Sequence, residues 1–347
     1  MSTKPTKNQP ADQASGAANT SRLPHRIALL LAAVVFPLIW VGGLVTTTDA
    51  GMAVPDWPNT YGYNMFSYPL ESWLYGPFDL MVEHGHRLLA SLAGVISIAL
   101  VWFTYRSEAR PWVKQFSVVL LALVIFQGLL GGARVVMDAR VVAKIHGCVG
   151  PLFFAFVAGF VTVTSRWWQG FDLQKQQDQL QGRATKWMTM LAPVMLTVSF
   201  GQLVVGAFMR HINVDSPPKL YVMLVAIHIM TAVLIVSGTL LQWFLSRRAQ
   251  VRGSGVRGSI NLLGLLVLVQ FGLGLTTWVV KFGWPAMMGD QRFASNYIVA
   301  EKTFTQMNLV TAHVAVGSLI LAFWTIHALR CRRSYHATAR LTLTTNP

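Results

Sequence analysis

The strongest constraint on this sequence is a series of eight apolar blocks of about 20 residues, separated by short polar segments. A block of that length without charge can cross the hydrocarbon core of a bilayer as a helix. Lipid offers no partner to unpaired backbone groups, so the segment has to satisfy its own N–H and C=O groups. The sequence therefore predicts an all-α, polytopic membrane protein with eight transmembrane helices. The spans are expected at 27–46, 83–104, 115–134, 145–165, 187–208, 221–243, 260–280 and 308–329.

The composition excludes several other classes of protein. Hydrophobic residues make up 53% of the chain and charged residues 12%, whereas a soluble domain has about 25% charged residues. A polar-surfaced globule, a disordered chain and a disulfide scaffold are all excluded. The two cysteines, Cys148 and Cys331, are expected on opposite sides of the membrane and unpaired. The sequence has no CxxCH motif, so covalent c-type haem is not indicated.

The net charge of +15 is distributed unevenly over the predicted topology. The two tails and the loops on their side carry 19 Lys and Arg residues, and the opposite loops carry 8. Because cytoplasmic segments are enriched in Lys and Arg, both termini are expected in the cytoplasm. The basic balance is therefore a topology signal, and nucleic acid is not an expected partner.

The two ends of the chain are polar. Residues 1–26 are predicted to be a cytoplasmic, disordered tail, and 330–347 a basic cytoplasmic tail. A cleaved signal peptide is the competing interpretation of 1–50, but the long tail and full-length apolar run favour a retained span. Asp12 and the low arginine content argue against a mitochondrial transit peptide. A bacterial cytoplasmic membrane is thus favoured over the mitochondrial inner membrane.

An internal repeat is suggested by features that recur in alternate spans. The odd-numbered spans end in glycine-rich phrases, which we interpret as sites of close helix packing. The even-numbered spans each carry a histidine near the outer end: His86, His146, His228 and His313. These patterns predict two pseudo-repeated four-helix bundles, at 27–165 and 187–329, joined by a cytoplasmic linker at 166–186.

Four histidines at matched depth point to iron ligation. One histidine in an apolar helix is usually a hydrogen-bonded core residue, but ionisable residues within spans are rare and tend to mark function. Haem iron accepts two axial imidazoles, so two histidines per bundle suit one haem each. The remaining histidines are weaker candidates, because they lie in tails, in a loop or off this register: His25, His84, His211, His327 and His336.

The two predicted halves differ at one acidic residue. Glu83 lies three residues before His86, on the same helix face, and Arg87 lies four residues after Glu83. One interpretation is a Glu83–Arg87 ion pair, and the other is an acid or base beside a reactive group. A di-iron bundle needs further acids that are absent from these spans. The asymmetry predicts a reactive haem in the first half and an electron-transfer haem in the second.

The first outer loop, 47–82, contains eight aromatic residues, four acids and no Lys or Arg. Its prolines argue against a long regular helix. Such a loop is either an aromatic belt at the membrane surface or a lid over a lipophilic substrate. The outer cations are expected to pair with haem propionates or to extend to the interface; they are Arg134, Arg140, Lys144 and Arg210.

These elements together resemble the haem A synthase family across about 27–329. The resemblance rests on 42–46, on 48–52 with the following Asp56 and Trp57, and on Glu83-x-x-His86-Arg87. It is completed by 127–131 and the three later histidines. Some members carry a cysteine pair in an outer loop, and this sequence has no cysteine there, so any redox role of that pair is absent.

The resemblance implies an enzyme with two similar four-helix bundles that oxidises the C8 methyl group of haem O to a formyl group. It implies that His86 and His146 bind the substrate haem, and that His228 and His313 bind a haem b cofactor. Glu83 would stabilise positive charge at the oxidised carbon or handle protons, and Arg87 would orient Glu83 or meet a propionate. Glu83 and Arg87 are the candidate catalytic residues.

Two other functions remain as alternatives at this point. A bis-histidine, two-haem cytochrome that moves electrons between quinol and an acceptor explains the histidines but gives Glu83 no task. A transporter leaves the matched register of the histidines unexplained. Besides haem O and the lipid bilayer, the resemblance implies a haem O synthase and oxidase-assembly factors as partners, and it is compatible with a homo-oligomer.

Overall fold

The computed structural model describes residues 21–170, 183–210, 216–249, 255–282 and 303–344. Its eight long helices are α1 (Leu23–Thr47), α3 (Phe78–Ser107), α4 (Pro111–Met137), α5 (Arg140–Thr164), α7 (Arg183–Arg210), α8 (Pro218–Arg248), α9 (Val256–Phe282) and α10 (Phe304–Thr344). Each contains a segment long and apolar enough to cross a membrane. The predicted all-α, eight-span polytopic fold is thus confirmed, with helices that extend beyond the expected spans at most ends.

Parts of three predicted segments lie outside the described residues. They are the first 20 residues of the N-terminal tail, most of the linker (171–182) and the last three residues of the basic tail. His211 also falls outside. Within the linker, the structure describes a short helix, α6 (Arg166–Gln169), whose first turn is capped by Ser165 Oγ accepting from the Trp168 N–H at 3.2 Å.

Prolines define several helix starts without breaking the spans. Pro24, Pro111 and Pro218 stand in the first turns of α1, α4 and α8. The missing N–H of proline costs nothing at that position. Further prolines lie inside α1, α5 and α7, which remain single helices. Neighbouring helices make such interior prolines tolerable in membrane spans.

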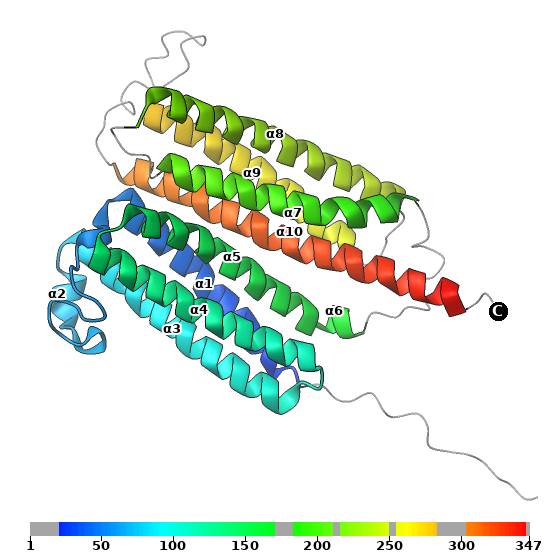
Figure 1. Ribbon diagram of the computed structural model, residues 1–347, viewed down its shortest axis with the longest axis horizontal. Coiled ribbons are helices and arrows are strands. Elements are labelled where there is room, and N and C mark those ends of the chain that lie inside the picture. The colour runs from blue at the N-terminus through cyan, green and yellow to red at the C-terminus, as the bar shows by residue number, and fades with distance from the viewer. Residues whose placement is uncertain (1–20, 171–182, 211–215, 250–254, 283–302, 345–347) are drawn as a thin grey trace, which may run out of the picture.

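The long helices form two four-membered groups, stacked as two layers in Figure 1. In the first, α1, α3, α4 and α5 contact one another in a closed ring, and α7, α8, α9 and α10 do the same in the second. Helix α10 also packs on α1 and α5, and α5 contacts α7. The repeat that the sequence suggests therefore stays a prediction, but the helix pairing of the two groups is the same.

Helix α10 contributes to the apolar core of both groups. Its Ala322 packs in the core of the first group with residues such as Phe160 and Leu31. Its Trp324 packs in the core of the second group with Ile260 and Leu263. Since the two faces of one helix serve both cores, the two groups pack as one body along α10.

The first outer loop is built from short elements, as its prolines predict. They are two 3₁₀ turns, η1 (Ala50–Met52) and η2 (Met65–Ser67), and one short helix, α2 (Leu70–Leu74). Tyr61 and Gly62 both have positive φ, and they form the tight turn that pairs Thr60 with Tyr63. In Figure 1 this segment lies at one end of the first bundle, next to the start of α3.

We expect Phe160→Ala to destabilise the protein by about 2–3 kcal/mol, because Phe160 is fully buried in the first core and its removal leaves a cavity. This loss of stability is smaller than for a Phe→Ala change in a soluble protein core, because an apolar side chain gains little free energy when it moves from lipid into the protein interior. The matched control is Phe126→Ala, whose side chain is 47% exposed toward the surface. Thermal unfolding in detergent measures both variants, and an equal loss of stability in the two would contradict the assigned core.

Candidate functional site

The structure brings the four predicted histidines together as two facing pairs. His86 on α3 faces His146 on α5, with their ring centroids 6.3 Å apart. His228 on α8 faces His313 on α10, and their ring centroids are also 6.3 Å apart. Each pair joins two helices that lie diagonally across one four-helix ring. The two histidines that were predicted to share one ligand in each half therefore face each other across their four-helix ring.

A glycine on the neighbouring odd-numbered span makes room for each imidazole. A Cβ added at Gly42 would lie 2.7 Å from Cε1 of His86, and one at Gly131 would lie 3.3 Å from Cε1 of His146. The same Cβ test at Gly206 and Gly274 meets His228 and His313 at 3.4 and 3.3 Å. The glycine-rich phrases thus pack against histidine rings, which is a more specific task than the helix packing predicted from the sequence.

Three glutamines one turn before these glycines were not identified from the sequence. Gln127 Nε2 donates to the backbone carbonyl of His146 at 3.1 Å, and Gln202 Nε2 donates to that of His228 at 2.9 Å. Gln270 Nε2 lies 3.4 Å from Nε2 of His313. The spacing Gln-x₃-Gly, present three times in the chain, is the signal that could have revealed them. These amides fix the backbone or ring of three of the four histidines.

The imidazole environment fits an iron-bound haem. A metal–imidazole nitrogen bond is about 2.0–2.1 Å, so two rings on opposite sides of one iron have centroids roughly 6 Å apart. In all four histidines Nδ1 is buried without a hydrogen-bond partner among the described residues. The carbonyls of Leu38 on α1, Gln127 on α4 and Gln270 on α9 lie near three of the rings. In metal sites such carbonyls accept from the histidine nitrogen that does not bind metal.

Glu83 and Arg87 form a buried ion pair in the first half. Arg87 Nη2 lies 2.9 Å from Glu83 Oε1, and the two residues are 9% and 3% exposed. The second carboxylate oxygen accepts the Val54 N–H at 2.9 Å. The ion pair with Arg87 lowers the free-energy cost of burying a carboxylate at the membrane boundary. It does not exclude a chemical role, because Glu83 still lies one helical turn from His86.

The Arg87 side chain also holds the first outer loop in place. Its terminal nitrogens donate to the carbonyls of Val54, Asp56 and Asn59 at 2.8, 2.7 and 2.9 Å. With the bond to Glu83, all four terminal N–H groups are used. Of the two tasks expected for Arg87, the structure shows the orientation of Glu83 and leaves no terminal donor for a propionate.

The loop between α1 and α2 packs over the outer end of the first histidine pair. The Trp57 ring lies on Gly132 of α4, next to the glycine that faces His146, and the Arg134 guanidinium lies on Gly51. Asp56 stabilises the turn by accepting the Tyr61 and Gly62 N–H groups, both at 2.8 Å. Burial acts to raise the pKa of Asp56, but these N–H groups and the Arg87 charge outweigh it and lower that pKa.

The aromatic residues of this loop have different surroundings. Trp73 and Tyr68 pack against His84, whose Nδ1 lies 3.0 Å from Thr60 Oγ1. His84 therefore serves the loop and not the first histidine pair, as its position on α3 predicts. Phe66 and Tyr75 are 72% and 87% exposed. These exposed rings suit a membrane-surface belt, whereas Trp57 is placed to cover the site.

The outer cations are directed into the protein in two cases. Arg210 Nη2 donates to the Gly43 carbonyl at 2.5 Å and to Thr47 Oγ1. Arg134 lies under the loop at Gly51. Lys144 Nζ stands 5.2 Å from the Phe208 ring. The expectation that side chains of this group extend to the interface is thus wrong for Arg210, because its guanidinium is hydrogen-bonded between the two halves.

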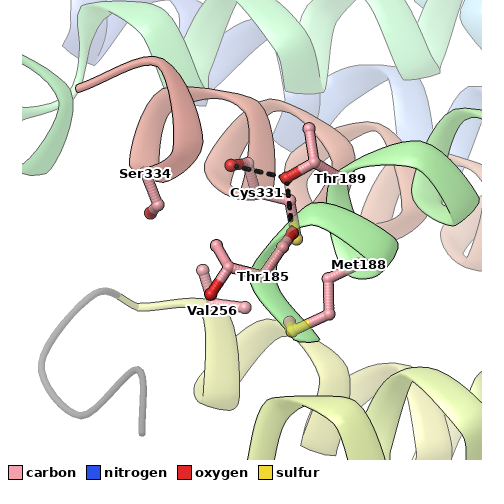
Figure 2. A pocket seen from close by; sticks show the side chains of 6 residues that line it. All are labelled: Thr185, Met188, Thr189, Val256, Cys331 and Ser334. Carbon is pink, nitrogen blue, oxygen red and sulfur yellow. Dashed lines mark hydrogen bonds between the residues drawn. The ribbon is translucent and has the colours of Figure 1, made fainter. Parts of the chain in front are cut away.

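The structure places two further features outside the histidine sites. His327 is fully buried and interacts with Ser259 Oγ at 2.9 Å. Figure 2 shows a small pocket between α7, α9 and α10, lined in part by Thr189 and Cys331. The Sγ atom of Cys331 lies 3.5 Å from Nε2 of His327. Cys331 follows His313 by 18 residues, or about 27 Å along a helix, so this pocket is remote from the histidine pairs. Both cysteines are free, as predicted.

We expect Gly42→Ala to weaken haem binding at the first histidine pair by about 10–100-fold, because the added Cβ would displace the His86 ring. Haem content per chain and the absorption spectrum measure the effect. The control is Gly128→Ala on α4, where an added Cβ has no neighbour within 4 Å among the described residues. Unchanged haem binding in Gly42→Ala would show that this glycine does not position His86.

Replacement of Arg87 by methionine should free the loop. The change leaves Glu83 buried without its partner and three loop carbonyls without their donor, at a cost of about 3–5 kcal/mol. Hydrogen exchange of 50–62 is expected to rise well above the wild type. Arg106→Met, at the exposed end of α3, is the control. Equal protection of the loop in both variants would argue against an anchoring role.

Comparisons with known proteins point to one family. The model of the COX15-CtaA family, described as cytochrome oxidase assembly protein, matches residues 25–214. The chain is 27% identical over 191 residues to a heme A synthase of Shouchella clausii, covering 54% of this chain and 59% of that protein. It is 27% identical over 259 residues to a heme A synthase of Symbiobacterium thermophilum, covering 68% and 79%.

A third relative, a heme A synthase of Exiguobacterium sibiricum, is 23% identical over 195 residues, which cover 54% of this chain and 61% of that protein. The matches to the first and third relatives thus span about three fifths of those proteins. The family model covers the whole first bundle, including His86, His146, Glu83 and Arg87, and extends through α7. With more than half of its length matched, the chain belongs to the COX15-CtaA family of cytochrome oxidase assembly proteins.

Proposed function

We propose that this protein is a haem A synthase, which oxidises the C8 methyl group of haem O to a formyl group and so supplies haem A to terminal oxidases. The observation that carries the proposal is the asymmetry of two otherwise matched sites. Both histidine pairs have the spacing of axial ligands, but among the described residues only the first pair has a carboxylate and a covering loop beside it. The names of the relatives support the same activity.

In this proposal His86 and His146 bind haem O as substrate, and His228 and His313 bind haem b as cofactor. Haem held by these pairs would supply the redox chemistry, with His86 and His146 holding the group that is oxidised and His228 and His313 holding the electron carrier. The covering loop, with Trp57 on Gly132, limits access of bulk water to the first pair. The second pair has the glutamine contacts but no acid one turn away, which suits a site that only carries electrons.

Glu83 is proposed to act as a fixed negative charge beside the substrate. Its two oxygens are held by Arg87 and by the Val54 N–H, so the carboxylate is oriented before substrate binds. A held anion stabilises positive charge that develops at the oxidised methyl carbon. Proton transfer to Glu83 would break the pair with Arg87, so the geometry favours the electrostatic role over the proton-carrying one. Arg87 is then a positioning residue.

The location follows from the same family assignment and the charge distribution. The eight apolar helices make this a multi-pass membrane protein. We propose the bacterial cytoplasmic membrane, with both termini in the cytoplasm and the histidine pairs near the outer face. A haem O synthase and oxidase-assembly factors are the expected partners, because haem O must be delivered and haem A removed.

Mass spectrometry of haem extracted from the purified protein tests this function. The expected result is haem b together with haem O or its hydroxylated and formyl derivatives. Haem b alone, with added haem O left unchanged, would support the alternative of a two-haem electron-transfer cytochrome. The absence of any haem would exclude both functions.

We expect Glu83→Gln to retain two haems per chain and to lose formyl formation by about 100-fold or more, because the developing charge loses its anion. The matched control is Glu108→Gln, which removes the carboxylate of a second ion pair, between the buried Glu108 at the C-cap of α3 and Arg110, at 2.7 Å. Formyl product is measured by mass spectrometry in both. Full activity in Glu83→Gln would remove this residue from the mechanism, and a loss in Glu108→Gln of the same size would indicate a general folding defect.

A further inference from the structure

A partly buried cation lies between the two halves, at the C-terminal end of α7. Arg210, the last residue of α7, donates from Nη2 to Gly43 O and Thr47 Oγ1, which both belong to α1. In the part of the chain that the structure describes, no carboxylate lies within ion-pair distance of Arg210. An arginine inside a membrane protein without an anionic partner is costly and tends to mark function.

The position of Arg210 relates it to both histidine pairs. On α7 it lies one turn beyond Gly206, the glycine that faces His228, and residues four apart share a helix face. On α1 it is bonded to the carbonyl of Gly43. The preceding residue, Gly42, is the one that faces His86. Arg210 is therefore four residues from the glycine that faces His228, and its guanidinium is bonded to the residue that follows the glycine facing His86.

Polar contacts continue from Arg210 through Thr47 to Thr311 on α10. Thr47 Oγ1 lies 3.3 Å from Thr311 Oγ1, and Thr311 is fully buried on α10. His313 follows Thr311 by two residues. A Cβ at Gly43 would lie 2.9 Å from the Thr311 methyl carbon, so α1 and α10 are in close contact here. Arg210, Thr47 and Thr311 therefore form one polar cluster between the two sites.

The other arginine of the outer end is placed differently. Arg134 lies under the first loop, and Glu83, Asp49 and Asp138 act on it electrostatically. Its charge is therefore partly compensated within the first half. Arg210 has no such acids acting on it among the described residues. The hydrogen bonds of Arg210 join α7 of the second half to α1 of the first, so its positive charge lies between the halves.

We propose that the charge of Arg210 acts on both haem sites and raises the reduction potentials of both irons. This inference rests on the proposed function only in requiring a haem at each histidine pair. Reduction adds an electron to the iron, and a nearby cation favours that charge state. The effect is strong in a medium of low dielectric constant, and local charge is one of the protein's means of setting a haem potential.

A redox titration of the purified haem-loaded protein, followed by absorption spectroscopy, tests the effect of this charge. Arg210→Met removes the charge but keeps an unbranched side chain, and both midpoint potentials are expected to shift to more negative values. Arg210→Lys keeps the charge, and both potentials should stay near those of the wild type. Lys219→Met, at an exposed outer position on α8, removes a cation away from the interface and should shift neither potential.

Potentials that do not move in Arg210→Met, or a shift confined to one haem, would overturn the proposal. If Arg210→Met does not yield folded protein, Arg210→Gln removes the charge and keeps amide N–H donors for Gly43 O and Thr47 Oγ1. It should lower both potentials relative to Arg210→Lys, and unchanged potentials there would also overturn the proposal. The haem content and haem types of the wild type report separately on the proposed synthase function.

Discussion

The contact on which both candidate sites depend is that of a histidine ring with a glycine of the adjacent helix. Within a bilayer, apolar side chains gain little by leaving lipid for protein, so helix association relies on close packing and polar contacts. Here each imidazole occupies space that a side chain would otherwise fill, at distances of 2.7–3.4 Å from where a Cβ would stand. The glycines of α1, α4, α7 and α9 let these helices pack closely against the four helices that carry the histidines, and they leave the space that each ring occupies.

That contact is common to both halves, and the differences between them lie outside it. In the second half, Gln202 and Thr231 hold the backbone at His228, and the described residues include no acid beside the pair. In the first half, Glu83 and Arg87 attach an entire loop to α3. The loop thereby depends on an ion pair that is itself adjacent to a ligand histidine. A chemical role for Glu83 and a structural one are therefore not alternatives, since one geometry serves both.

The sequence was sufficient for the number of helices, their approximate limits and the histidine pairs. Each of these follows from a periodic or local property, either 20 apolar residues or a histidine at a fixed depth. The loop contacts were beyond its reach, because the three carbonyls that Arg87 binds are backbone atoms and have no side-chain signature. The glutamines at 127, 202 and 270 belong to the glycine-rich phrases, but the contacts that they make depend on which helix packs against them.

Arg210 shows most clearly why burial cannot be inferred from position along a span. An arginine at the end of a transmembrane helix ordinarily reaches the interface, because its long side chain can carry the charge to water. Arg210 is instead held between α7 and α1, where the Gly43 carbonyl and Thr47 hydroxyl accept its hydrogen bonds. Only the packing of the second half against the first creates those acceptors. The position of the Arg210 guanidinium thus depends on the contact between the two halves, because its residue belongs to the second half and its acceptors belong to the first.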